Sequence, residues 1–394
     1  MKYRKLSLYL PDGLDPKEIP GNGERPARIA YFGQQLTIRP FDCLSKHVPI
    51  NATSLRKDIS KRAVIEALKY FGPMIETNQS YKVGKHPKGY RWGQSMRGKK
   101  AVKHDFICPR FIEKLNSNKA SGKAHYGSIE RQLDEDMHNI SLDIPNIADY
   151  INQIPPKLGT RCETHRRNVL QYTAECIQCS DYGLILRSNT NGRIYCCINR
   201  LSSYIRPGLL LYGEPVVEID LASSQPYFLA SIFKCLPLID AVSKGQFYNR
   251  INERLKPPLN FTNISTYKSF KRIILSIIFA HNKYGYRYWT KAEFKHAQVR
   301  EAMGKAYPGI LEFIEQYRRR NGPTALAIDM QSAESSVFID RVLATLQSQG
   351  IPSIPIHDSI MCRLSDVDHV QELMHMHLTK ETSIRPTLCR SVSA

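Results

Sequence analysis

The stretch Val216-Val-Glu-Ile-Asp-Leu-Ala-Ser-Ser-Gln-Pro226 decides the fold, because its apolar strand ends at a carboxylate, Asp220. A second stretch, Ile354-Pro-Ile-His-Asp-Ser-Ile-Met-Cys362, predicts a strand, a tight turn and a strand, with His357 and Asp358 in the turn. Magnesium prefers one or two carboxylates together with water and phosphate oxygens. The two aspartates therefore predict a site for two Mg²⁺ ions and for phosphoryl transfer to a 3′-hydroxyl. For either residue alone, a turn or cap role is the alternative.

A basic, otherwise apolar helix is predicted between these two aspartates, over Ser269–Ala280. Lys268, Lys271 and Arg272 cluster in its first turn or so, where positive charge suits the phosphates of a nucleoside triphosphate. Phe279 follows Lys271 by two helical turns, so it lies near the same face and is a candidate for stacking on an incoming base. The structural alternative is a core phenylalanine with solvated lysines.

The rest of the chain mixes strand and helix patterns after residue 181, which predicts an α+β catalytic half. Residues 1 to about 125 are predicted to be loop-rich and basic, and residues 126–180 mainly helical. The helices predicted elsewhere are His165–Gln178, Gln225–Cys235, Pro308–Arg319, Ala333–Gln349 and Val367–Leu378.

Composition narrows the class of protein. The chain has 394 residues, a formal net charge of +20 and 42% hydrophobic residues. It is therefore expected to fold into roughly two or three domains with a real core. Such a charge favours nucleic acid as the partner, because phosphate contacts release condensed counterions. No apolar run approaches the roughly 20 residues of a membrane span, and the start is too broken for a signal peptide. We expect no membrane partner, a cytoplasmic location and reduced cysteines.

The most basic stretch, Lys82–His104, holds eight lysines or arginines and no acidic residue. It also carries Tyr90 and Trp92. Cations interleaved with aromatic rings suit a loop that binds a nucleic-acid strand, with rings stacked on bases. A solvated surface loop explains the stretch equally well.

Four residues with two-residue gaps form a candidate structural zinc site: Cys162 and His165, then Cys176 and Cys179. The interval between the pairs is predicted to be one helix, which would hold them about 15 Å apart. The site therefore requires a break in that helix. Cys196 and Cys197 are an alternative source of one pair.

The order of Asp220, the basic helix and His357-Asp358 resembles motifs A, B and C of the single-subunit palm polymerases. This superfamily comprises the family A DNA polymerases and the phage-type single-subunit RNA polymerases. The resemblance covers residues 188–364 and implies a right-hand fold with palm, short fingers and helical thumb. Two segments resemble the RNA polymerase branch. They are the stretch Lys271–Arg287, which ends in Lys-Tyr-Gly-Tyr-Arg, and the triplet His357-Asp358-Ser359.

Other segments are similar to the DNA polymerase branch. The segment Thr190–Tyr195 resembles its Thr-Gly-Arg element, which implies that Arg193 contacts the primer–template duplex. Met330–Glu334 resembles its Gln-Gly-Thr-Ala-Ala element, which implies that Gln331 lies in the nascent minor groove. Two further elements match in order along the chain, Gly245-Gln-Phe-Tyr248 and Tyr307-Pro-Gly309.

Three departures from that branch bear on the substrate. Tyr267 replaces an arginine, so Lys268 or Arg272 would take over its phosphate contact. Gln225 replaces the glutamate that helps to exclude a 2′-hydroxyl. A glutamine could block a ribose sterically or hydrogen-bond its 2′-hydroxyl. Phe279 replaces a tyrosine whose hydroxyl RNA polymerases use in ribose selection. The sugar evidence thus points both ways, and the flanking elements favour deoxynucleotides.

These observations predict a DNA-directed DNA polymerase of a phage or other mobile element, acting in the host cytoplasm on a DNA primer–template and nucleoside triphosphates. RNA polymerase or primase-polymerase activity, with RNA as product or template, is the first alternative. A non-catalytic nucleic-acid-binding replication protein is the second. We expect a basic nucleic-acid-binding region over 1–125, a thumb-like region over 126–185, and palm and fingers over 186–394. The fingers, about 245–325, are short, so processivity would depend on an accessory replication protein.

Overall fold

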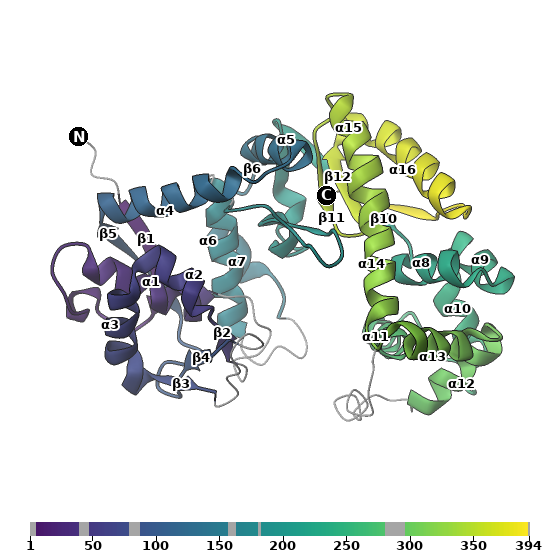
Figure 1. The fold of residues 1–394 in the computed structure, drawn as a ribbon, viewed down its shortest axis with the longest axis horizontal. Helices are drawn as coiled ribbons and strands as arrows, with labels where there is room; N and C mark the ends of the chain where they lie inside the picture. The colour runs from purple at the N-terminus through teal and green to yellow at the C-terminus, as the bar shows by residue number, and fades with distance from the viewer. Residues whose placement is uncertain are drawn as a thin grey trace. The chain divides into compact units, whose positions relative to one another are not determined.

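A computed structural model describes residues 5–38, 47–78, 87–156, 163–179, 183–279 and 296–392. Within these ranges the chain forms two compact units of mixed helix and strand (Figure 1). The first unit comprises Met1–Arg131, Ile140–Leu184 and Cys196–Leu209, and the second comprises Gln132–Asn139, Ile185–Tyr195 and Leu210–Ala394. The mixture agrees with the predicted α+β class.

The first unit contains small antiparallel sheets covered by helices. Strand β1 (Lys5–Pro11) pairs with β5 (Ala101–Ile107), and β4 (Gly89–Trp92) pairs with both β2 (Val48–Pro49) and β3 (Ile75–Thr77). The prediction that residues 1–125 are loop-rich is therefore wrong, because most of the described part of this stretch is regular structure. The helices of the first unit are α1 (Arg25–Ile38), α2 (Ala52–Ile59), α3 (Lys61–Phe71), α4 (Pro109–Lys123), α6 (Ile147–Gln153) and α7 (Glu163–Gln178). Most of helix α5 (Ser128–His138) belongs to the second unit.

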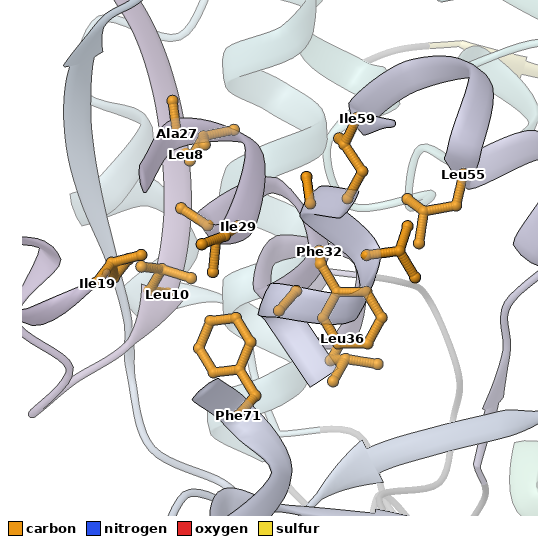
Figure 2. Close-up of a cluster of buried hydrophobic side chains, with 14 of the residues drawn as sticks. Leu8, Leu10, Ile19, Ala27, Ile29, Phe32, Leu36, Leu55, Ile59 and Phe71 are labelled. Carbon is orange, nitrogen blue, oxygen red and sulfur yellow. The ribbon is translucent and has the colours of Figure 1, made fainter. Parts of the chain in front are cut away.

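The core of the first unit gathers around α1, whose buried residues include Ile29, Phe32 and Leu36 at helical spacing (Figure 2). The ring of Phe32 stacks on Phe71 of α3, with 6.1 Å between ring centroids. Gly33 lets α1 approach β1, since a Cβ there would lie 2.8 Å from the Leu10 side chain. Close packing thus explains why a glycine is accepted in the middle of this helix.

The aromatic residues of the basic stretch belong to this core. Tyr90 and Trp92 are only 8% and 6% exposed, and the Trp92 indole N–H donates to Thr37 Oγ1 at 3.2 Å. They lie on β4 rather than in a loop, so the expected stacking on bases is wrong for both residues. The four-residue strand β4 gives little sequence signal, because basic residues surround it on both sides. Residues 79–86, at the start of the basic stretch, lie outside the described part.

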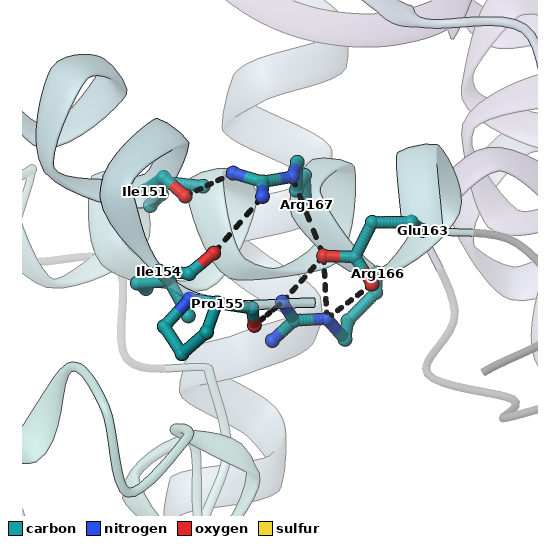
Figure 3. Close-up of polar contacts among 6 residues, drawn as sticks. All are labelled: Ile151, Ile154, Pro155, Glu163, Arg166 and Arg167. Atoms are coloured by element: carbon teal, nitrogen blue, oxygen red, sulfur yellow. Dashed lines mark hydrogen bonds and ion pairs between the residues drawn. The ribbon is translucent and has the colours of Figure 1, made fainter. Parts of the chain in front are cut away.

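Two arginines at the start of α7 fix that helix to the end of α6 (Figure 3). Arg167 donates to the carbonyl oxygens of Ile151 and Ile154, and Arg166 donates to that of Pro155. Glu163 forms ion pairs with both arginines. These contacts satisfy carbonyls that a helix end leaves without an intrahelical partner. Two of the chain's positive charges are therefore engaged in holding the fold.

The second unit is built on an antiparallel sheet with β10 (Glu214–Leu221) inside it. Strand β10 pairs with β12 (Ser359–Arg363) along one edge, and β13 (Leu388–Val392) pairs with its other edge. Strands β11 (Ser353–Ile356) and β12 form a hairpin, and α16 (Val367–Thr382) packs against β10 and β12. The strand predicted to end at Asp220 and the predicted strand–turn–strand are both confirmed.

The helices of the second unit depart from prediction mainly at their starts. Helix α11 (Ile264–Phe279) begins before Ser269, where the Asn263 side chain accepts from the Ser265 and Thr266 backbone N–H groups. Lys268, Lys271 and Arg272 therefore lie in its middle and not in its first turn. The remaining helices are α8 (Ser224–Phe233), α9 (Leu236–Ser243), α10 (Phe247–Asn252), α12 (His296–Ala306), α13 (Ile310–Asn321) and α14 (Ala325–Val337).

The long helix that contains α14 is irregular. It begins at Ala325 rather than at the predicted Ala333 and passes through a π-helical segment, Phe338–Leu343, into α15 (Ala344–Ser348). The π segment buries Phe338 and Leu343 and packs against β11 and α16. Within the described ranges, every helix is too short or too polar to cross a membrane.

Candidate functional site

The two predicted carboxylates lie side by side at one end of the sheet. Asp220 on β10 is opposite Ser359 in the register with β12, and Asp358 directly precedes Ser359. The Leu221 backbone N–H donates to the Asp358 carbonyl oxygen at 3.1 Å. His357 completes the tight turn with a left-handed φ of 56°, and its ring meets Tyr195 edge-on at 5.6 Å. The structure therefore brings together the aspartates that sequence alone could only pair by pattern.

A third carboxylate extends along the same face of β10. Glu218 precedes Asp220 by two residues, and Ser359 Oγ donates to Glu218 Oε1 at 2.7 Å. Burial raises the pKa of Asp358, and the charge of Glu218 raises it further. Arg193 and Lys271 oppose this rise. A carboxylate in such surroundings is stabilised in its ionised form by added positive charge.

The donor set fits magnesium better than zinc. Across the described ranges, no group of three or more His, Cys, Asp or Glu side chains is arranged to hold a metal ion. Two neighbouring aspartates with oxygen donors are nevertheless what Mg²⁺ takes from a protein, since water and substrate phosphates complete its octahedron. Asp220 and Asp358 are therefore the residues that would hold such ions.

Of the three basic candidates on α11, Lys271 is the one whose charge acts on Asp358. Its ammonium lies 5.1 Å from the ring centroid of Tyr248 and 5.5 Å from that of Tyr267. Its charge also lowers the pKa of Asp358. Lys268 and Arg272 are exposed on the same helix, where they remain accessible to an anion.

The last described residue of α11, Phe279, is half-buried. The Lys-Tyr-Gly-Tyr-Arg sequence at 283–287, which resembles the RNA polymerase branch, lies outside the described residues, and Phe279 remains a candidate by resemblance only.

A small hairpin, β7 (Leu186–Arg187) and β8 (Ile194–Tyr195), packs on α14 and brings two predicted residues together. Asn191 Nδ2 donates to Gln331 Oε1 at 2.8 Å, and Arg193 forms an ion pair with Glu334 at 2.6 Å. Gly192 has a φ of 71°, and a Cβ there would lie 3.3 Å from Ser335. This glycine allows the hairpin and the helix to approach closely.

Glu334 is the most unusual residue of the site, because its charged side chain is 0% exposed. Its Oε1 is paired with Arg193, while its Oε2 accepts from Ser224 Oγ at 3.1 Å and from Gln225 Nε2. Burial raises the pKa of Glu334 to about 7; Arg193 opposes this rise, and the charge of Asp358 adds to it. One carboxylate thus connects the hairpin to the first turn of α8, which directly follows Asp220.

Sequence reasoning assigned no role to Glu334, Glu218, Ser224 or Tyr248. The available signal for Glu334 was a single charge among small and apolar neighbours on a helix, Met330-Gln-Ser-Ala-Glu-Ser-Ser-Val337. A charge in such a setting is either exposed or paired in the interior. Its partner lies 141 positions away in sequence, so no local pattern identifies it.

The segments Gly245–Tyr248 and Tyr307–Gly309, which resemble the DNA polymerase branch, contact each other and hold neighbouring helices together. Tyr307 donates to the Phe247 carbonyl oxygen at 2.9 Å, and their rings are parallel within 3° at 5.2 Å. Gly309, with a φ of 81°, precedes α13. These residues fix α10 relative to α12 and α13.

The zinc candidate gains no support from the described residues. Helix α7 runs unbroken over Glu163–Gln178, as expected, so its two ends stay apart. Cys162 and the side chain of His165 lie outside what the structure describes. Cys176 and Cys179 line a cavity of about 610 Å³ in the first unit together with Cys197.

No family model and no curated protein matches the chain. Among solved structures, it is similar to the POL domain of Pol1 from M. smegmatis in complex with DNA primer-template and dNTP. The TM-score is 0.44 and the sequence identity is 11%. The match covers 72% of this chain and 64% of that chain, so it spans less than two thirds of the Pol1 domain.

Proposed function

We propose that this chain is a template-directed nucleic-acid polymerase, which adds nucleotides to a 3′-hydroxyl. The observation that carries the proposal is the pairing of Asp220 and Asp358 at one end of adjacent antiparallel strands. Lys271 and Arg193 lie close enough to influence the charge of Asp358. Two carboxylates facing fixed cations are what phosphoryl transfer between nucleotides requires of a protein.

Each residue takes a defined part in this proposal. When bound at Asp220 and Asp358, two Mg²⁺ ions supply the charge that activates the attacking 3′-oxygen and stabilises the leaving pyrophosphate. Lys271 neutralises the developing charge on the pyrophosphate, from a position already fixed against Tyr248. Lys268 and Arg272 bind phosphates from the exposed side of α11, and Phe279 stacks on the incoming base.

The template side of the site is assigned to the hairpin and α14. Arg193 and Gln331 are both held by side-chain contacts between these elements, so neither has to be ordered when a duplex binds. His357, beside Asp358, contacts the primer end. The sheet of β10 and β12 corresponds to the palm, residues 245–325 to short fingers and residues 126–185 to a thumb-like region.

The favoured product is DNA, because more of the flanking elements resemble the DNA polymerase branch. The partners are a DNA primer–template and nucleoside triphosphates, with an accessory replication protein for long templates. The proposed source is a phage or other mobile element, with the protein acting in the host cytoplasm. Residues 1–125 contribute positive charge for nucleic-acid binding. RNA polymerase or primase-polymerase activity is retained as the alternative, because Gln225 and Phe279 depart from the DNA branch.

The decisive experiment is primer extension with deoxynucleotides and ribonucleotides in parallel, on DNA and RNA templates, with and without primer. We expect Mg²⁺-dependent extension with release of pyrophosphate. Nucleic-acid binding without any pyrophosphate release would instead support a non-catalytic replication protein and would overturn the proposal.

A further inference from the structure

The cavity of about 610 Å³ in the first unit has no part in the proposed mechanism. All of its lining residues belong to that unit, and they come mainly from strand β1 and helices α1, α4 and α7. On α4 the lining residues Ile112, Leu115 and Lys119 recur at helical spacing, so one face of this helix forms a wall. Ligand pockets have volumes of roughly 300–1,000 Å³, so this cavity is large enough for a single nucleotide.

The hydroxyl of Tyr9 is the polar group of this cavity that the fold does not explain. Tyr9 lines the cavity and is only 5% exposed, and its hydroxyl has no hydrogen-bond partner among the described residues. The ring is fixed edge-on against Tyr172 of α7 at 5.5 Å, and the Tyr9 backbone N–H donates to Gln34 Oε1 at 2.8 Å. A buried hydroxyl without a partner is uncommon and costs free energy. We therefore expect a molecule in the cavity to supply the partner.

The charged side chains of the cavity wall favour an anion. Three lysines line the cavity, Lys5, Lys103 and Lys119, against one carboxylate, that of Glu175. This carboxylate is already engaged, because Lys103 Nζ lies 3.5 Å from its Oε2 and Gln171 Nε2 donates to its Oε1 at 2.9 Å. Positive charge therefore exceeds negative charge on the wall, which attracts a phosphate group.

The uncharged side chains of the wall suit a nucleobase. Tyr31 and Tyr172 supply aromatic surface, and the side-chain amides of Gln35 and Asn116 supply both donors and acceptors. Base edges also carry donors and acceptors, but in a duplex they are paired and the bases are stacked on one another. A nucleotide can therefore enter a cavity of this kind only when its base is unpaired.

We propose that this cavity binds one unpaired nucleotide, with its phosphate against the lysines and a polar atom of the nucleotide bonded to the Tyr9 hydroxyl. The same chemistry recognises a nucleotide within a single strand and a free nucleotide. In the strand form, the first unit holds unpaired template while the second unit carries Asp220 and Asp358. This role on the template rests on the proposed function, whereas nucleotide binding does not.

The thiol of Cys179 reports whether the cavity is occupied, because it lines the cavity and is exposed. The full chain is treated with iodoacetamide at increasing concentrations of a probe, and modification of Cys179 is followed by peptide mass spectrometry. The probes are a short oligothymidylate, its duplex with the complementary strand, and thymidine monophosphate.

We expect the single strand to slow alkylation of Cys179 and the duplex to leave it unchanged. Protection by thymidine monophosphate as well identifies a free nucleotide as a ligand, and protection by the oligothymidylate alone identifies a strand. Equal protection by single strand and duplex, or protection by none of the probes, overturns the proposal.

The variant Tyr9→Phe separates a contact with the ligand from a structural role. It removes only a hydroxyl that finds no partner in the described part of the chain, so the free energy of unfolding should not fall. The affinity for oligothymidylate, measured from protection of Cys179, should fall about three- to tenfold. Tyr70→Phe is the matched control, because this half-buried tyrosine of the same unit does not line the cavity. An unchanged affinity in Tyr9→Phe overturns the proposal.

The variant Lys119→Gln tests the phosphate contact. It should weaken binding of the oligothymidylate and lower the slope of log affinity against log salt concentration by about one. The control Lys69→Gln removes an exposed lysine of the same unit outside the cavity and should keep the affinity at the cavity. Equal effects of the two variants on protection of Cys179 contradict a phosphate site at Lys119.

The outcomes separate this site from the proposed function. Thiol protection does not require nucleotide addition, so a chain that protects Cys179 but extends no primer keeps the cavity site and loses the polymerase assignment. A chain that extends primers without any protection of Cys179 keeps the polymerase assignment and loses the cavity site.

Discussion

The two units differ in the kinds of side chains that they bury. Around α1 in the first unit, the buried cluster is aliphatic and aromatic, and the buried Thr37 accepts a hydrogen bond from Trp92. Around β10 in the second unit, burial includes charge, with Glu334 fully enclosed and Asp358 half-enclosed beside Glu218. Each unit has a core, and in the second the fully buried carboxylate of Glu334 is paired with a cation, Arg193.

This difference in buried charge indicates which unit contains the functional site. Burying an ionised group costs free energy unless it is paired, so a fold that needs only stability fills such positions with apolar side chains. The first unit follows that rule around Phe32 and Phe71. The second unit departs from it at Glu334 and Asp358, which indicates that its charges serve a purpose other than stability.

The largest expected effect is on activity, from Asp358→Asn. We expect the rate of nucleotide addition to fall by about a thousandfold or more, since the variant removes one of the two charges that would hold the metal ions in the proposed mechanism. The free energy of unfolding should not fall, because a buried charge is replaced by a neutral side chain of the same shape. Extension kinetics measure the rate, and chemical denaturation measures the free energy of unfolding.

Glu253→Gln, which removes an exposed carboxylate from the same unit, is the matched control and should leave the rate unchanged. Retained extension by Asp358→Asn would contradict the assignment of the site.

The next effect is on stability, from Phe71→Ala in the first unit. Phe71 is fully buried and packs against Phe32 and Trp92, so we expect a loss of about 3–5 kcal/mol in the free energy of unfolding. Chemical denaturation followed by circular dichroism measures it. The control is Ile65→Ala on the same helix, whose side chain is 58% exposed and whose removal should change stability little. Equal losses for the two variants would contradict the core described here.

A smaller effect is the pH dependence contributed by Glu334. Its folded pKa of about 7 lies above the ordinary value of 4.5, so the folded state binds the proton more tightly than the unfolded state does. The stability linked to this group is fully present below pH 4.5 and is lost as the pH rises through about 7.

Glu334→Gln removes this titration, so unfolding free energies measured from pH 4.5 to 8 should decline less steeply in the variant than in the unaltered chain. Parallel declines in the two proteins would show that Glu334 is not the titrating group.

The smallest effect is expected from Trp92→Phe. The ring volume is largely kept, and only the indole N–H donated to Thr37 is lost, so stability should fall by about 1 kcal/mol. Binding of single-stranded DNA should not change, because the buried ring is not available to a base. A weakened affinity in a filter-binding or anisotropy assay would restore the original interpretation of Trp92 as a stacking residue.

Sequence patterns predicted three strands of the second unit's sheet, β10, β11 and β12, because each carries its own local signal, but they did not predict β13. Apolar runs end at Asp220 and flank His357, and both strand boundaries follow from these local features. Helix starts were predicted less well. The α11 start depends on the Asn263 cap, and the run preceding Ala333 has no clear amphipathic period.

The features that sequence patterns do not predict are contacts between residues that lie far apart in the chain. A sequence motif identifies Arg193, but no local pattern identifies its partner Glu334, with which it forms an ion pair. The burial of Tyr90 and Trp92 does not follow from their own segment, because it depends on α1, which lies far from them in sequence and covers the sheet. Local patterns thus identify Asp220 and Asp358 as candidates, whereas tertiary contacts decide which other groups lie beside them.

The π-helical segment Phe338–Leu343 has a consequence for chain length. A π turn accommodates one more residue than an α turn, so this segment takes up an additional residue without changing which faces of the flanking helices pack. In an uninterrupted α-helix the same residue would rotate Gln331 and Glu334 by about 100° relative to the face that packs on β11. The π turn therefore lets one continuous helix present Glu334 to Arg193 and also pack on β11.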